Sequence, residues 1–133
     1  MRAMLLAVVV AAAAALAAAS VAGAGMMHPD LGARLSGMGH HGVVNLQSHM
    51  KKGRLCWKFD LHVTELERAS IRDAQGMVVA RLGKTYKPKG CTMAAKKALR
   101  LIESKPGRYV VWVDTKGHPG ELRGKLHAGM AHM

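Results

Sequence analysis

The sequence predicts an all-β protein, an antiparallel β-sandwich or barrel with one short helix. Residues Arg54 to Thr64 alternate between apolar and polar side chains, as in a strand with one buried face. The aromatic and β-branched run Tyr109–Val113 is followed by Gly- and Pro-containing turn residues and by a second alternating stretch that ends at Leu126, as in a β-hairpin. After the amino-terminal apolar run, one segment, Met93–Ser104, is rich in good helix formers and contains no Gly or Pro.

The first 24 residues have the pattern of a secretory signal peptide. Arg2 supplies a positive start, residues 4–19 form an apolar run, and Ala22-Gly23-Ala24 is a small-x-small cleavage pattern, although cleavage after Ser20 also fits. A membrane anchor is the alternative, because the run approaches the length that spans a bilayer. Its high Ala content and the lack of a following basic cluster favour cleavage. We therefore expect a secreted, periplasmic or cell-envelope protein with no transmembrane span after cleavage.

The rest of the chain divides into three parts. Residues 25–42 are rich in Gly, Met and His and predict a flexible segment, within which Leu31–Leu35 is a possible first edge strand. Residues 43–126 are expected to form the β domain, with Thr92 as the N-cap of the helix. Residues 127–133 lack a packing pattern and predict a disordered tail. Further strands are expected at Val43–Leu46, Ala69–Arg72 and Met77–Leu82.

The chain is strongly basic. It contains 20 Lys and Arg against 8 Asp and Glu, and its net charge of +12 falls to +11 when Arg2 is removed with the signal peptide. Such a charge favours anionic partners such as cell-wall polymers, anionic lipid headgroups or nucleic acid. Specific nucleic-acid binding is not expected, because the cations are scattered and aromatic residues for base stacking are few. A solvated surface that keeps an exported protein soluble would explain the same composition.

The two cysteines, Cys56 and Cys91, predict a disulfide, because an even cysteine count in an exported chain is typical of one. In the loop-entropy model, a bridge that closes a loop of this size stabilises the fold by roughly 3 to 4 kcal/mol. A metal site or a reactive thiol pair is the alternative. It is disfavoured because the chain has no CxxC spacing and no His adjacent to either cysteine.

Three segments share the pattern of one domain family. They are Gly53-Arg54-Leu55-Cys56-Trp57-Lys58-Phe59, then Gly90-Cys91 before the predicted helix, and then residues 109–126, which include Tyr-Val-Val-Trp-Val-Asp-Thr and Pro-Gly-Glu-Leu-Arg-Gly-Lys-Leu. Over about Val43–Leu126 the chain resembles the CHRD domain, named after chordin and widespread in exported bacterial proteins. The resemblance implies an immunoglobulin-like β fold, export and no established catalytic activity.

The chain departs from that family at one segment. Members usually carry Ala-His-Ile-His, and the matching residues here are Ala69-Ser70-Ile71-Arg72, so both histidines are absent. Any metal or polar role of that pair is therefore lost here. The Pro-Gly spacing near Pro119 is also tighter than the common pattern.

Methionine and histidine side chains are concentrated near the two ends of the mature chain. Thioether and imidazole ligands suit copper, especially Cu(I), and an exported protein would encounter it. Low-complexity linkers with no metal role would show the same composition. The candidate metal ligands are His28, His40, His41, His127, His132, Met130 and Met133, with Met26, Met27 and Met38 nearby.

No catalytic set is predicted. HExxH, P-loop and serine-elbow motifs are absent, and the acidic residues are not spaced as a general acid and base pair. The protein is therefore expected to be a non-enzymatic binding or structural module, with a copper-binding protein as the alternative. Arg123 is expected to have a structural role, in which its guanidinium bridges a carboxylate or carbonyl groups such as those of Asp114.

Overall fold

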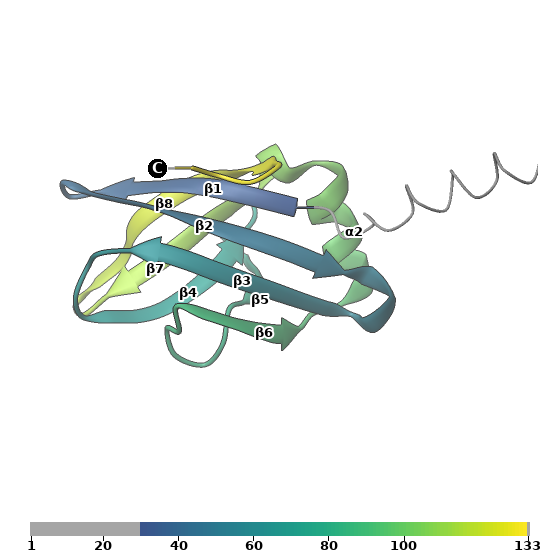
Figure 1. Cartoon of the computed structure of the whole chain (residues 1–133), viewed down its shortest axis with the longest axis horizontal. Coiled ribbons are helices and arrows are strands. Elements are labelled where there is room, and N and C mark those ends of the chain that lie inside the picture. Colours follow the sequence, from purple (N-terminus) through teal and green to yellow (C-terminus); the bar gives the residue numbers. More distant parts are fainter. Residues whose placement is uncertain (1–29, 133) are drawn as a thin grey trace, which may run out of the picture.

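The computed structural model describes residues 30–132, which form one antiparallel sheet of eight strands and one α-helix (Figure 1). This confirms the predicted antiparallel β fold with a single short helix. Hydrogen-bonded neighbours follow the order β5-β4-β7-β8-β1-β2-β3-β6. The elements are β1 (Asp30–Gly37), β2 (His40–His49), β3 (Arg54–Leu61), β4 (Leu66–Arg72), β5 (Val78–Arg81), β6 (Lys89–Met93), α2 (Lys96–Ser104), β7 (Val110–Thr115) and β8 (His118–Ala128), with short 3₁₀ turns at Met50–Lys52 and Pro106–Arg108.

The sheet curls until its two edges face each other (Figure 1). The edge strands are β5 and β6, and a cavity of about 360 Å³ lies between residues 78–81 and residues 92–95. No ladder of hydrogen bonds joins these two strands within the described residues. The molecule is therefore a nearly closed barrel made from one sheet, with α2 near one end (Figure 1).

The core fills the inside of this barrel, as strand alternation requires. On β3, Leu55, Trp57 and Phe59 are buried as predicted, and the Trp57 indole donates a hydrogen bond to the Lys87 carbonyl at 3.0 Å. The helix adds Leu99 and Ile102, both almost completely buried. The other large buried side chains are Leu31, Leu35, Val44, Leu46, Ile71, Leu82, Val111, Leu122 and Leu126.

The prediction of a flexible segment with an edge strand at Leu31–Leu35 is wrong for the described residues. β1 lies inside the sheet between β8 and β2, and β2 begins at His40. Leu31 and Leu35 point into the core, which makes this strand central. The hairpin turn is possible because Met38 and Gly39 both have positive φ, 47° and 80°.

The predicted helix start is also wrong. Residues Lys89–Met93 form β6, and α2 begins at Lys96 with Ala95 at the N-cap position and no side-chain capping hydrogen bond. Thr92 therefore lies in a strand. The pairing of β6 with β3 outweighs the local preference for a helix cap, as tertiary contacts commonly do.

The end of the chain is ordered as far as His132, contrary to the predicted disordered tail. β8 continues to Ala128, and the Gly129 amide then donates to the Asp30 carbonyl at 2.8 Å. Residues 129–132, which we call the C-terminal tail, cross the outer face of β1 and β2, where Ala131 is only 4% exposed. Gly32 leaves room for the tail, because a Cβ there would lie 2.5 Å from the Ala131 nitrogen.

The predicted signal peptide lies outside the described residues. Within residues 30–132, no helix has the length and apolar character needed to cross a membrane.

Candidate anion-binding surface

Arginine side chains gather on the outer face of five neighbouring strands, β5, β4, β7, β8 and β1. Each is placed there by strand alternation, because at least one of the two residues beside it in the chain is buried in the core. All are exposed except Arg72, which is half-buried. The arginine face, as we call this surface, consists of Arg34, Arg68, Arg72, Arg81 and Arg123, and Lys125 lies on the same face.

Trp112 lies at the centre of the arginine face. Its register partners are Ser70 on β4 and Arg123 on β8. The guanidinium carbon of Arg72 is 4.1 Å from the ring centroid, and that of Arg123 is 3.8 Å from it. Because β4 and β8 flank β7 on opposite sides, the two cations approach the indole from opposite sides. Both contacts have the geometry of cation–π interactions.

Hydrogen bonds hold each guanidinium in its orientation. Arg72 donates from Nε to the Ser70 hydroxyl at 3.3 Å and from Nη1 to the Gly76 carbonyl at 3.1 Å. Arg123 donates from Nε to the Gly120 carbonyl at 2.9 Å. In both residues Nη2 has no protein acceptor in the described part of the chain. The arrangement therefore leaves N–H donors that can reach an external anion.

A turn in β8 supports Arg123. Gly120 has a φ of 64°, and its amide donates to the Asp114 carboxylate at 2.5 Å. Arg123 was expected to bind a carboxylate or a carbonyl group such as that of Asp114. In the structure it donates to the Gly120 carbonyl instead. Asp114 and Arg123 each bind Gly120, so they are linked through the backbone of the turn.

No arginine of the arginine face forms an ion pair with a carboxylate in residues 30–132, although Asp114 is the register partner of Arg68. Among residues 30–132, the only ion-pair contact within 4.0 Å joins Asp60 and His62, at 3.3 Å and far from Trp112 in the strand order. The positive potential of the arginines is thus not cancelled by direct pairing. A face of this kind attracts anions, and arginine binds carboxylate, phosphate and sulfate oxygens in bidentate geometry.

Sequence reasoning missed this site. The five arginines are separated by up to about ninety positions, and in sequence the cations look scattered. The two positions where the family resemblance breaks, Ser70 and Arg72, are hydrogen-bonded to each other beside Trp112. One signal in the sequence could have indicated the site. In the predicted final hairpin, Trp112 can lie opposite Arg123, which occupies a solvent-facing strand position.

Several lysines occupy other surfaces. Lys58 on β3 and Lys89 on β6 are register partners, and Lys96 and Lys97 lie exposed at the start of α2. Like charges in directly opposed positions repel each other. The arginine face differs from these lysine surfaces in its aromatic centre, where two guanidinium groups contact Trp112.

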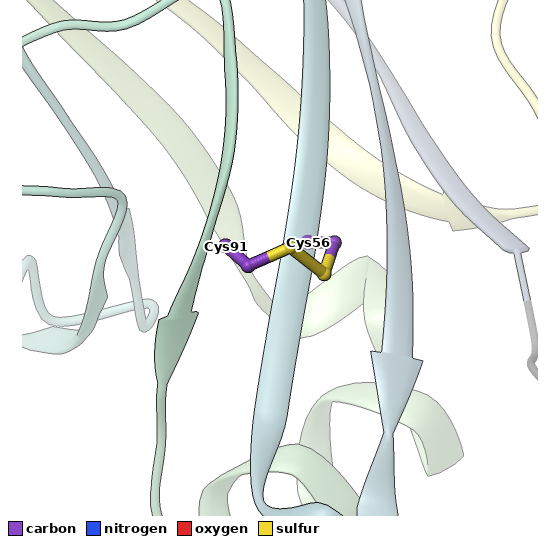
Figure 2. The surroundings of a disulfide bond; sticks show 2 residues. All are labelled: Cys56 and Cys91. Carbon is purple, nitrogen blue, oxygen red and sulfur yellow. A yellow bond between two sulfur atoms is a disulfide. The ribbon is translucent and has the colours of Figure 1, made fainter.

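The predicted disulfide is present. Cys56 on β3 and Cys91 on β6 are register partners with their Cα atoms 4.0 Å apart (Figure 2). The bond ties the edge strand β6 to β3, its single partner in the sheet. The described part of the chain contains no free cysteine.

The structure brings together only some of the predicted metal ligands. His41 and His132 line one cavity of about 420 Å³, and Met130 and His132 line a second of about 500 Å³. His40 is at the β1–β2 hairpin tip, whereas His127 pairs with Gly32, roughly 16 Å along the strand from that tip. No group of three His, Cys, Asp or Glu residues in positions 30–132 is arranged to hold a metal. His28 and Met133 lie outside the described residues.

Comparison with known proteins adds no assignment. No protein-family model matches the chain, and no curated protein matches it.

Proposed function

We propose that the protein is an exported, non-enzymatic binding module of CHRD type that attaches to anionic polymers of the cell envelope. The observation that carries the proposal is the arginine face, on which Arg72 and Arg123 contact Trp112 and none of the five arginines forms an ion pair with a carboxylate of the described residues. The apparent signal peptide and the CHRD-like segments support export and a module of this kind. Electrostatic attraction to a polymer would be sensitive to salt, because the face is open to solvent.

The test compares two variants that remove the same charge from different surfaces. Arg34→Gln/Arg68→Gln/Arg81→Gln weakens the arginine face without touching the Trp112 contacts. Lys96→Gln/Lys97→Gln/Arg100→Gln removes three cations from α2 and serves as the matched control. On a sulfated or phosphorylated polysaccharide resin, we expect the first variant to elute at clearly lower salt than the wild type and the second to elute close to the wild type.

Two results contradict the proposal. Equal shifts for both variants would show that only net charge matters. Release of the wild-type protein below physiological salt would show that the face does not hold a polymer. Circular dichroism of each variant establishes that the β fold is retained.

Copper binding is a second candidate, favoured by one observation. The C-terminal tail places His132 beside the same cavity as His41, from the β1–β2 hairpin. Imidazole and thioether donors suit Cu(I), and the Met130 thioether lines the second cavity that His132 also lines. We expect the wild type to compete with a chromogenic Cu(I) chelator and His41→Ala/His132→Ala to lose that ability. His118→Ala is the control, because it changes an exposed histidine on β8, away from His41 and His132 in the sequence. Equal copper uptake by all three proteins would contradict this candidate.

A further inference from the structure

We infer that Arg72, Trp112 and Arg123 form a two-point site for two separate tetrahedral oxyanion groups, phosphate or sulfate, of one linear polymer. This inference rests on the proposed function and names the ligand class and the residues that bind it. The three residues, which we call the Arg–Trp–Arg stack, bring together side chains from three adjacent strands, β4, β7 and β8.

The geometry of the stack requires two anionic groups. The two guanidinium carbons lie on opposite sides of the indole, each about 4 Å from the ring centroid, so they are at most about 8 Å apart. The indole fills the space between them, so one small anion cannot contact both cations closely. A polymer with charged groups repeated at a comparable spacing can place one group on each guanidinium.

The stack is also preorganised. The Nε donors of both arginines and one Nη1 donor of Arg72 are already used by Ser70, Gly76 and Gly120. The remaining Nη donors are fixed in orientation before a ligand arrives, which lowers the entropy lost on binding. Phosphate and sulfate groups offer several oxygens to such a planar donor, which favours them as ligands.

The experiment follows tryptophan fluorescence of the full protein at constant ionic strength. Trp112 is half-exposed in the stack, whereas Trp57 is 5% exposed in the core, so a change caused by surface binding reports mainly on Trp112. The probes are orthophosphate, long-chain polyphosphate, dextran sulfate and polyglutamate. We expect polyphosphate and dextran sulfate to bind at least tenfold more tightly, per anionic group, than orthophosphate, and more tightly than polyglutamate.

Variants assign the effect to the stack. Arg72→Gln and Arg123→Gln should each weaken polyphosphate binding about tenfold, whereas Lys96→Gln should change it less than twofold. Since Trp112 loses a contact in the first two, Arg72→Lys and Arg123→Lys provide a second pair that keeps the charge. We expect the lysine variants to remain on an anionic resin but to lose the preference for polymer over orthophosphate, because an ammonium lacks the planar donor set.

Several outcomes overturn the inference. If both Gln variants bind polyphosphate as the wild type does while Arg34→Gln/Arg68→Gln/Arg81→Gln weakens it, the arginine face binds polymers but the stack is not the site, and the proposed function survives. Orthophosphate binding as tight as polymer binding would show a single-anion site. Polyglutamate binding as tight as polyphosphate binding would show that carboxylates are equally good ligands. Failure of every polymer to bind would overturn the proposed function as well.

Discussion

Tyr86 is the residue whose ionisation the fold changes most clearly, since burial raises the pKa of its phenol. Its ring packs against Phe59 with the ring centroids 5.2 Å apart. Above the ordinary tyrosine pKa of about 10, the unfolded chain loses the proton before the folded protein does. Its contribution to the free energy of unfolding is therefore fully present below pH 10 and is lost as the pH rises through the folded-state pKa.

We expect Tyr86→Phe to lose less stability than the wild type between about pH 9 and pH 11. Urea denaturation at a series of pH values measures the difference. Tyr109→Phe controls for the loss of a tyrosine hydroxyl elsewhere in the protein. Parallel stability curves for the wild type and Tyr86→Phe would contradict the prediction.

Gly120 is the residue on which the geometry of the Arg–Trp–Arg stack depends most directly. A Cβ at this position would lie 2.7 Å from Cε3 of Trp112, and the backbone φ of 64° disfavours other residues. We expect Gly120→Ala to lower the free energy of unfolding by about 1 to 2 kcal/mol and to weaken polyphosphate binding. Gly107→Ala is the matched control, because a Cβ there meets nothing within 4 Å. Equal urea midpoints for the two variants would count against this role.

Among the elements, β6 depends on one partner strand and one covalent bond. Its ladder joins β3 alone, and the Cys56–Cys91 disulfide links the two strands across a sequence separation of 35. We expect Cys56→Ala/Cys91→Ala to lower the free energy of unfolding by roughly 3 to 4 kcal/mol in the loop-entropy model. Amide hydrogen exchange should accelerate first in residues 89–93.

Intact mass and denaturation test the role of this bond. The protein purified without a reducing agent should show no free thiols. An unchanged urea midpoint after reduction would mean that the disulfide contributes nothing to stability.

The C-terminal tail is held by the side chain of one residue on β2. Asn45 donates from Nδ2 to the Ala131 carbonyl at 3.2 Å and accepts from the Ala131 amide at 2.6 Å. We expect Asn45→Ala to release the tail, to speed exchange of the Ala131 amide and to cost about 1 to 2 kcal/mol of stability. Gln47→Ala, which removes an exposed hydrogen bond to Asp30, is the control. Protection of Ala131 that survives in Asn45→Ala would show that other contacts hold the tail.

Local sequence patterns predicted some of the strands and helices correctly and missed others. The alternation in β3 and the β7–β8 hairpin were read correctly because side-chain periodicity records which face is buried. β6 was missed because Thr92 next to good helix formers resembles a helix start. The docked tail was missed because its anchor, Asn45, is 86 positions away in the sequence.

At the scale of the whole molecule, the nearly closed barrel brings five arginines from distant parts of the sequence onto one outer face. Together with Lys125 they occupy the outer face of β5, β4, β7, β8 and β1, while other cations lie on β3, β6 and α2. A net charge of +12 on its own indicates only attraction to anions. The contacts of Arg72 and Arg123 with Trp112 mark a defined position on the surface where an anion could bind.

The sequence by itself determined the antiparallel β class, the single helix, the disulfide and the basic surface. These properties follow from periodicity, propensity and composition, which act over a few residues or over the whole chain. Only the tertiary structure decided that β1 is central, that the tail covers β2 and that Arg72 and Arg123 meet on Trp112. The physical reason is that strand order and register arise from contacts between segments far apart in sequence, and local patterns do not encode which strands become neighbours.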